Sequence, residues 1–108
     1  MNKSENILIL GLGGVGFYLA KRLSHEGHAV TVVELYPDAV NRADGEVDAR
    51  LMRADALDFS TWLDADAKKM DYLIAVTDDD AVNILGSLIA DRCGIRQKIA
   101  RVRSLALW

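Results

Sequence analysis

Short apolar runs alternate with segments of helical periodicity along this chain. The runs Ile7–Leu10 and Tyr72–Val76 are continuously apolar, which is the pattern of strands covered on both faces of a parallel sheet. The stretch at 29–35 is rich in β-branched residues, and shorter runs at 50–53 and 98–102 have strand character. The pattern therefore predicts five strands.

The segments between these strands repeat their apolar residues every three or four positions. Val15, Leu19 and Leu23 fall at i, i+4 and i+8, which predicts a helix over residues 14–26 with this face against the sheet. The only proline, Pro37, suits the first turn of a short second helix.

Two more helices are expected further along. The first is short, and its apolar residues fall at i, i+3 and i+4: Phe59, Trp62 and Leu63. The second follows three successive aspartates, residues 78–80, because helix N-termini favour side-chain caps and negative charge. Its buried side is expected to consist of Ile84, Leu85, Leu88, Ile89 and Cys93, before a stop at Gly94.

This order of elements predicts an α/β fold. We expect a Rossmann-like, doubly wound parallel sheet with strand order 3-2-1-4-5, right-handed crossovers and helices on both faces. The 108 residues suffice for one domain, which we assign to residues 1–108. The apolar tail, Leu105 to Trp108, is interpreted as the start of another element in a shortened chain, and we expect it to be ordered against a neighbour or to drive self-association.

Composition narrows the function classes. The chain is 51% hydrophobic with a net charge of −3, so it is globular and lacks the basic excess typical of a nucleic-acid surface. Its single cysteine excludes an intrachain disulfide and suits a reducing cytoplasm. No apolar stretch reaches the roughly 20 residues that a membrane-spanning helix needs.

A glycine motif follows the first predicted strand. Gly11, Gly13 and Gly16 fit G-x-G-x-x-G, the fingerprint of a dinucleotide-binding βαβ unit. In this motif the first glycine permits a tight turn, the second lets the backbone approach a pyrophosphate, and the third lets the helix pack closely. The free N–H groups and the dipole of the following helix favour phosphate.

Glu34 stands eighteen residues after Gly16, at the end of the second predicted strand. There a carboxylate can accept both hydroxyls of an adenosine ribose, whereas the alternative is a solvated loop charge. Because the residues after Glu34 include no cation up to Pro37, a 2′-phosphate would be repelled. The sequence therefore predicts a preference for NADH over NADPH of at least about tenfold.

Other polar residues at strand ends have two interpretations each. Asp55 either reaches the adenine side of a ligand or caps the next helix. Thr77 and Asp78 adjoin the point where ligands collect in doubly wound sheets, although helix entry alone would explain them. Arg101 and Arg103 alternate on the fifth strand and face a phosphate, a neighbouring subunit's carboxylate or simply solvent.

These motifs together resemble one family. Gly-Leu-Gly-Gly-Val-Gly, Glu34, Ala54-Asp55-Ala56, Val-Thr-x-x-Asp-x-x-Asn from Val76 and Arg101-Val102-Arg103 occur in the order and spacing of the TrkA-N domain. This domain, also called the RCK or KTN N-terminal lobe, is a cytoplasmic nucleotide-binding regulator of potassium channels and transporters. The resemblance implies a cofactor site made of Gly11, Leu12, Gly13, Gly14, Val15, Gly16, Glu34, Asp55, Ala56, Thr77, Asp78 and Arg101.

The resemblance also implies the ligand and the partners. The ligand would be NAD(H), or ADP or ATP, and the partner a potassium channel or transporter membrane subunit, with packing between lobes carrying the signal in a homo-oligomer. Gly14 stands where some members that bind nucleoside triphosphates carry Arg, which disfavours ATP, and Ala54 replaces a usual glycine. The last strand and crossover helix of the lobe are absent from this sequence.

An enzyme is the main alternative. The chain could be the cofactor-binding part of a small NAD-dependent oxidoreductase, but such an enzyme needs a substrate domain and a proton-transferring residue near the nicotinamide. Neither His25 nor His28 follows the end of a predicted strand. We therefore expect no catalysis. An interaction module with a decayed nucleotide site is a third alternative, which the intact glycines and Glu34 disfavour.

Overall fold

The computed structural model describes residues 3–104, so the tail at 105–108 lies outside the described residues. The strands are β1 (Asn6–Leu10), β2 (Ala29–Glu34), β3 (Arg50–Arg53), β4 (Tyr72–Ala75) and β5 (Gln97–Ala100). The helices are α1 (Gly14–His25), α2 (Pro37–Ala43), α3 (Phe59–Asp64), the single 3₁₀ turn η1 (Ala67–Lys69) and α4 (Asp80–Arg92).

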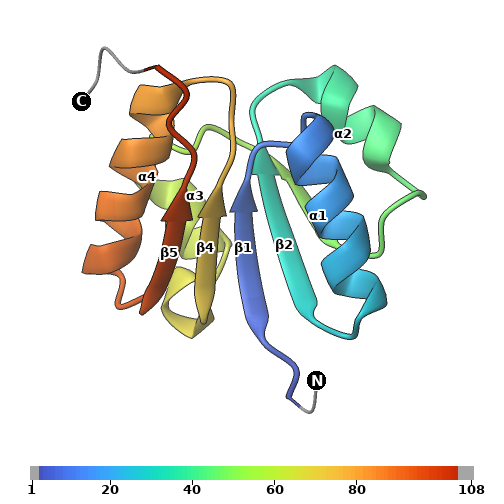
Figure 1. The fold of residues 1–108 in the computed structure, drawn as a ribbon, viewed down its shortest axis with the longest axis horizontal. Helices are drawn as coiled ribbons and strands as arrows, with labels where there is room; N and C mark the ends of the chain where they lie inside the picture. Colours follow the sequence, from blue (N-terminus) through green and yellow to red (C-terminus); the bar gives the residue numbers. More distant parts are fainter. Residues whose placement is uncertain (1–2, 105–108) are drawn as a thin grey trace.

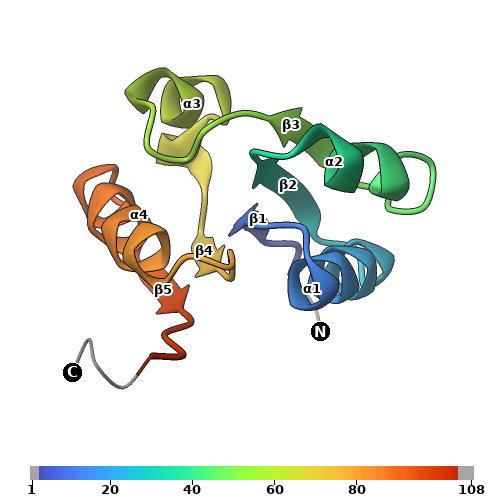
Figure 2. The ribbon, with the colours of Figure 1, turned by 90° about the horizontal axis from the view of Figure 1, so that it is seen from above.

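All five strands are parallel, in the order β3-β2-β1-β4-β5 (Figure 1). Helices α1 and α2 cover one face of the sheet, and α3 and α4 cover the other (Figure 2). This arrangement confirms the predicted doubly wound fold and its strand order. The strand order reverses between β1 and β4, so the carboxyl ends of these two strands diverge into loops on opposite faces.

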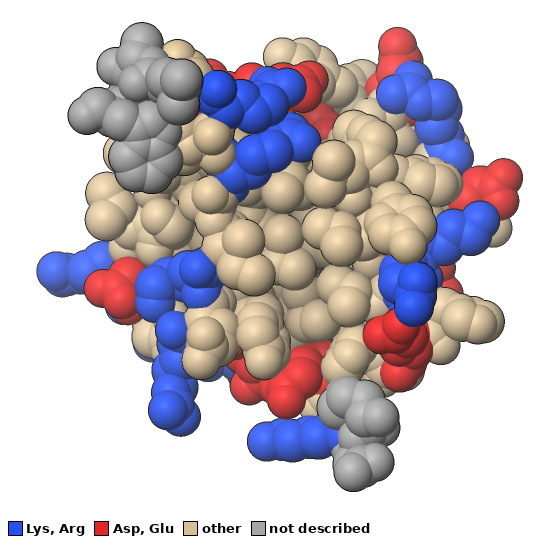
Figure 3. Space-filling model, viewed as in Figure 1, with Lys and Arg blue, Asp and Glu red and all other residues tan. Residues whose placement is uncertain are grey.

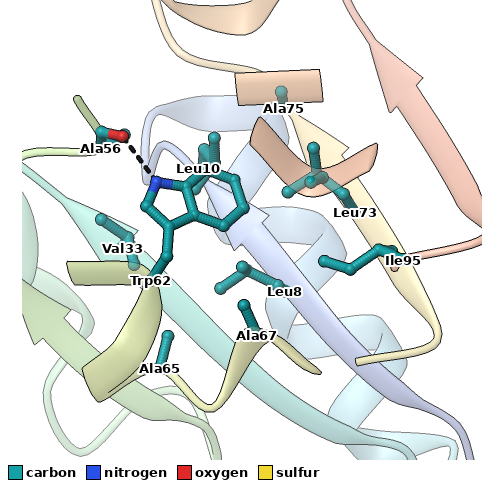
Figure 4. Packing of buried hydrophobic residues seen from close by; sticks show 11 residues of the cluster. Leu8, Leu10, Val33, Ala56, Trp62, Ala65, Ala67, Leu73, Ala75 and Ile95 are labelled. Carbon is teal, nitrogen blue, oxygen red and sulfur yellow. Dashed lines mark hydrogen bonds between the residues drawn. The ribbon is translucent and has the colours of Figure 1, made fainter. Parts of the chain in front are cut away.

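The core consists of two layers, one on each side of the sheet. Leu8 and Leu10 of β1 point into the layer under α3 and α4, whereas Ile7 and Ile9 point into the layer under α1 and α2. Trp62 fills the first layer, and its indole Nε1 donates a hydrogen bond of 2.8 Å to the Ala56 carbonyl (Figure 4). A buried tryptophan thus satisfies its one polar atom locally.

Several predicted helix faces are wrong. Small residues make the fully buried contact with the sheet, Gly16 and Ala20 in α1 and Gly86 and Ala90 in α4. Of the predicted large residues, Leu19, Leu23, Ile89 and Cys93 are partly buried against the core. Several apolar residues of the predicted helical patterns are exposed: Val15, Phe59, Leu63, Ile84, Leu85 and Leu88, of which Leu63 is 74% exposed. Helix α3 keeps only Trp62 of its predicted stripe in the core. The fifth strand also ends earlier than predicted, at Ala100.

The physical reason is close helix–sheet contact. A Cβ built on Gly16 would collide with the Gly11 carbonyl group, and one on Gly86 would lie 2.6 Å from a methyl of Leu10. The helices therefore lie too near the sheet for large side chains beneath their axes. The large apolar residues lie to either side of this line of contact, where they are partly buried or exposed. The apolar periodicity therefore located the helices correctly but did not identify their most buried residues.

One sheet face is uncovered within the described residues. No helix of residues 3–104 lies over β4 and β5 on the side of α1 (Figures 1 and 2). Figure 3 shows the molecular surface in the orientation of Figure 1. Uncharged side chains occupy the centre of this face, and charged residues lie mainly around its margin. Ile99 of β5 is 57% exposed. No helix among these residues is long and apolar enough to cross a membrane.

We expect Gly16→Ala to lower the free energy of unfolding by roughly 1–3 kcal/mol, because its methyl group would overlap the Gly11 backbone, which cannot rotate away. Urea denaturation of both proteins measures this difference. Gly14→Ala is the matched control, since a Cβ at Gly14 meets nothing within 4 Å and gains helix propensity. Equal destabilisation by the two changes would contradict this account of α1.

Candidate functional site

A cleft of about 480 Å³ opens at the carboxyl ends of β1, β2 and β4. Its position at the reversal of strand order is the one expected of a ligand site in such a sheet. Eight of the predicted site residues line it: Gly11, Leu12, Gly13, Glu34, Asp55, Ala56, Thr77 and Asp78. The other four, Gly14, Val15, Gly16 and Arg101, do not line it.

Gly11 and Gly13 of the glycine loop differ in what surrounds them. Gly11 has φ +103°, and a Cβ there would lie 2.8 Å from the Val76 carbonyl oxygen, so β4 itself requires glycine at this position. Gly13 is the residue before α1, and a Cβ there meets nothing within 4 Å. The protein's own packing therefore does not require glycine at Gly13. Gly13 also lines the cleft.

Glu34 is only 9% exposed, so it is not a solvated loop charge. One carboxylate oxygen accepts the Leu12 N–H at 2.7 Å, and the other accepts the Tyr36 N–H at 3.0 Å. These two bonds tie the end of β2 to the glycine loop and to the start of α2. A carboxylate has about four lone-pair positions, so Glu34 retains capacity for the two hydroxyls of a ribose.

Asn83 organises the opposite wall of the cleft. It is fully buried, and its amide oxygen accepts the Thr77 N–H at 2.9 Å and the Thr77 hydroxyl at 2.7 Å. Its amide nitrogen donates to the carbonyls of Thr77 and Arg101, at 3.1 and 2.9 Å. Asp79 begins α4, with its carboxylate accepting the Ala81 N–H. Asn83 was within the recognised motif, but sequence reasoning gave it no role.

The arginines after β5 find partners within the chain. Arg101 donates from its guanidinium to the carbonyls of Val76 and Thr77, both at 3.0 Å, and its buried Nε has no hydrogen-bond partner among the described residues. Arg103 donates to the Asp78 carbonyl at 2.7 Å and lies 3.8 Å from its carboxylate. Arg101 therefore supports the loop after β4 from behind, and a direct ligand contact remains a prediction.

Asp80 fastens the segment that follows β5. Its carboxylate accepts the backbone N–H groups of Arg103, at 3.1 Å, and of Ser104, at 2.8 Å. These two bonds, the Arg103 one first, hold the pKa of Asp80 below its ordinary value of 3.8. The chain after β5 thus contacts five residues that follow β4: Val76, Thr77, Asp78, Asp80 and Asn83.

The charge lining the cleft is mostly negative. Five carboxylates line it: Glu34, Asp38, Asp55, Asp78 and Asp79. Arg42 of α2 is the one lysine or arginine among the described lining residues. Residues 35–37 contain no cation, but Arg42, further along α2, lines the same cleft as Glu34. Asp55 accepts the Leu57 N–H at 2.9 Å, and its carboxylate still borders the cleft.

A second hollow lies between α1 and the chain before β3. It is larger, at about 650 Å³, and is lined by residues of both charge signs, among them Arg22, His25 and Asp48. It lies away from the strand ends that carry the glycine motif. The cleft at the strand ends is therefore the candidate site, and no group of three or more metal-ligating side chains occurs among residues 3–104.

Comparisons with known proteins agree with this geometry. A family model described as the TrkA-N domain matches residues 7–106. The Trk system potassium uptake protein TrkA homolog 2 of Methanosarcina mazei is 36% identical over 99 residues, which cover 90% of this chain and 22% of that relative. The chain thus spans about a fifth of that relative's length.

Two solved structures share the fold. The Kef CTD of Shewanella denitrificans in its AMP-bound form has a TM-score of 0.70 and 20% identity, covering 87% of this chain and 56% of that one. A 3-hydroxyacyl-CoA dehydrogenase from Archaeoglobus fulgidus has a TM-score of 0.67 and 14% identity, covering 93% and 35%. At such identities the likeness establishes the Rossmann-like fold and no more.

The Asp80 contact predicts a pH response. Because the folded pKa of Asp80 is lowered, its stabilising bonds are fully present near neutral pH and are lost as the pH falls through that pKa, below 3.8. The amide proton shifts of Arg103 and Ser104 should titrate together with this midpoint in NMR spectra. Asp80→Asn should abolish the titration. A midpoint at or above 3.8 would contradict the contact.

Proposed function

This chain belongs to the TrkA-N domain family, and from that premise we propose that it is a regulatory domain that binds NAD(H) and reports its binding to the membrane subunit of a potassium uptake or channel system. The observation that carries the proposal is Gly13. The protein's own packing does not require a glycine at this position, because a Cβ there would meet nothing within 4 Å. A pyrophosphate bound in this open space would require it.

The residues of the cleft fit an adenine dinucleotide. The loop Gly11–Gly13 and the N-terminal N–H groups of α1 would hold the pyrophosphate, and no acidic residue lies in the first turn of α1 to oppose it. Glu34, already oriented by Leu12 and Tyr36, would accept the ribose hydroxyls. Asp55 and Ala56 would border the adenine, and Thr77 and Asp78 the nicotinamide half. ADP or ATP would use the same adenosine contacts.

The second part of the proposal is regulation. A ligand that touches Thr77 or Asp78 would act on the same loop that Asn83, Arg101 and Asp80 bind to the chain after β5. Movement of this loop would therefore move residues 101–104 as well. We place the domain in the cytoplasm as part of a homo-oligomer, with the uncharged face over β4 and β5 as the surface available for packing, and with no nucleic-acid partner.

Gly13→Val is expected to abolish NADH binding in calorimetry, because its side chain would fill the pyrophosphate position. The thermal midpoint should change little, since a Cβ at this position meets no protein atom within 4 Å. Gly13→Ala, which adds a single methyl group, should bind more weakly than the wild type but more tightly than Gly13→Val. Unchanged NADH affinity in a folded Gly13→Val protein would refute the proposed site.

We also expect no redox turnover by the pure domain. His28 binds the Glu5 N–H through its Nδ1 at the amino end of the sheet, and neither histidine lines the cleft. NADH absorbance should therefore stay constant with small carbonyl substrates present. Steady consumption of NADH that disappears in Gly13→Val would establish the oxidoreductase alternative.

A further inference from the structure

Arg42 occupies a position in the cleft that the proposed function leaves unexplained. It lies on α2, four residues after Asp38, so the two side chains share a helix face and are separated by about 6 Å along the axis. Both line the cleft, on the side where Tyr36 binds Glu34. Arg42 thus borders the cleft from α2, which follows β2, whereas Gly13 borders it from the loop that follows β1.

The Arg42 side chain also has no partner among residues 3–104. Neither a hydrogen bond nor an ion pair joins its guanidinium to any of these residues, although Glu34 and Asp38 line the same cleft. The carboxylate of Glu34 is instead held by two backbone N–H groups. The guanidinium is therefore available to an anionic group of a ligand bound beside Glu34.

We propose that Arg42 forms a subsite for a phosphate on the 2′ position of the adenosine ribose, so that the domain accepts NADP(H)-type ligands as well as NAD(H). This inference rests on the proposed function. A guanidinium matches the geometry of a phosphate and can donate two parallel hydrogen bonds to it. A 2′-phosphate carries nearly two negative charges at neutral pH, which makes it the strongest anion that an adenosine ligand presents on this side.

Glu34 and Asp38 oppose the same group. Their carboxylates only accept hydrogen bonds and repel a phosphate, whereas Arg42 attracts it. The balance of two negative charges and one positive charge keeps the 2′-hydroxyl ligand preferred. Arg42 makes the difference in affinity between 2′-hydroxyl and 2′-phosphate ligands smaller than the difference that Glu34 alone would produce.

The chain supplies a matched control in Arg53. It stands opposite Glu34 in the β2–β3 register and is exposed, but it does not line the cleft. Removing Arg53 changes the net charge of the domain as much as removing Arg42 does. A comparison of the two variants therefore separates a local contact from a general electrostatic effect.

The test uses two small probes in calorimetry at one low salt concentration: 5′-AMP, and 2′,5′-ADP, which adds only the 2′-phosphate. The full chain should bind both, with 5′-AMP tighter. Arg42→Ala should weaken 2′,5′-ADP about tenfold and change 5′-AMP less than about twofold. Arg42→Lys should recover part of the loss, because it keeps the charge but not the planar donor pair. Arg53→Ala should leave both affinities nearly unchanged.

The outcomes separate this inference from the proposed function. Undetectable binding of 2′,5′-ADP to the wild type, an equal effect of Arg42→Ala on both probes, or an effect of Arg53→Ala as large as that of Arg42→Ala would overturn the inference while nucleotide binding stands. Failure of the wild type to bind 5′-AMP and NADH would overturn the proposed function, and this inference with it. The same changes in NADH and NADPH affinity would extend the result to complete dinucleotides.

Discussion

The contact between Gly16 and the Gly11 carbonyl group is the constraint on which the rest of the site depends. Because no side chain separates the two backbones, α1 begins directly above the end of β1. The first residue of α1, Gly14, therefore follows directly on Gly13, which lines the cleft. On the other face Gly86 allows the same close approach of α4 to Leu10. Two glycines far apart in sequence therefore set the thickness of both layers.

The cleft is shaped by polar side chains that bind backbone groups. Glu34 holds two N–H groups at the end of β2, and Asn83 holds donors and acceptors at the ends of β4 and β5. Buried polar groups of this kind are costly to leave unpaired, so each fixes the loop that it touches. The walls are pre-formed, and a ligand would not have to order them.

The sequence was sufficient for the architecture, because strands buried on both faces and a glycine turn leave strong local patterns. Glu34 was predictable for the same reason: its distance from Gly16 follows from the length of one βα unit. The exposed Leu88 and Leu63 were mispredicted, because periodicity identifies an apolar stripe but not how near the helix lies to the sheet. Arg42 was missed because it lies eight residues after Glu34, and only the course of α2 brings it to the same cleft.

The buried Asn83 amide cannot be replaced by a side chain of similar shape. Its side chain accepts two hydrogen bonds and donates two, and it does so with no exposure to solvent. An aspartate of the same shape would provide no donors and would add a charge without water to stabilise it. Replacing this one amide with a carboxylate would therefore remove both hydrogen bonds to the Thr77 and Arg101 carbonyls, and with them the contact of Asn83 to the chain after β5, although the β4–β5 ladder itself would remain.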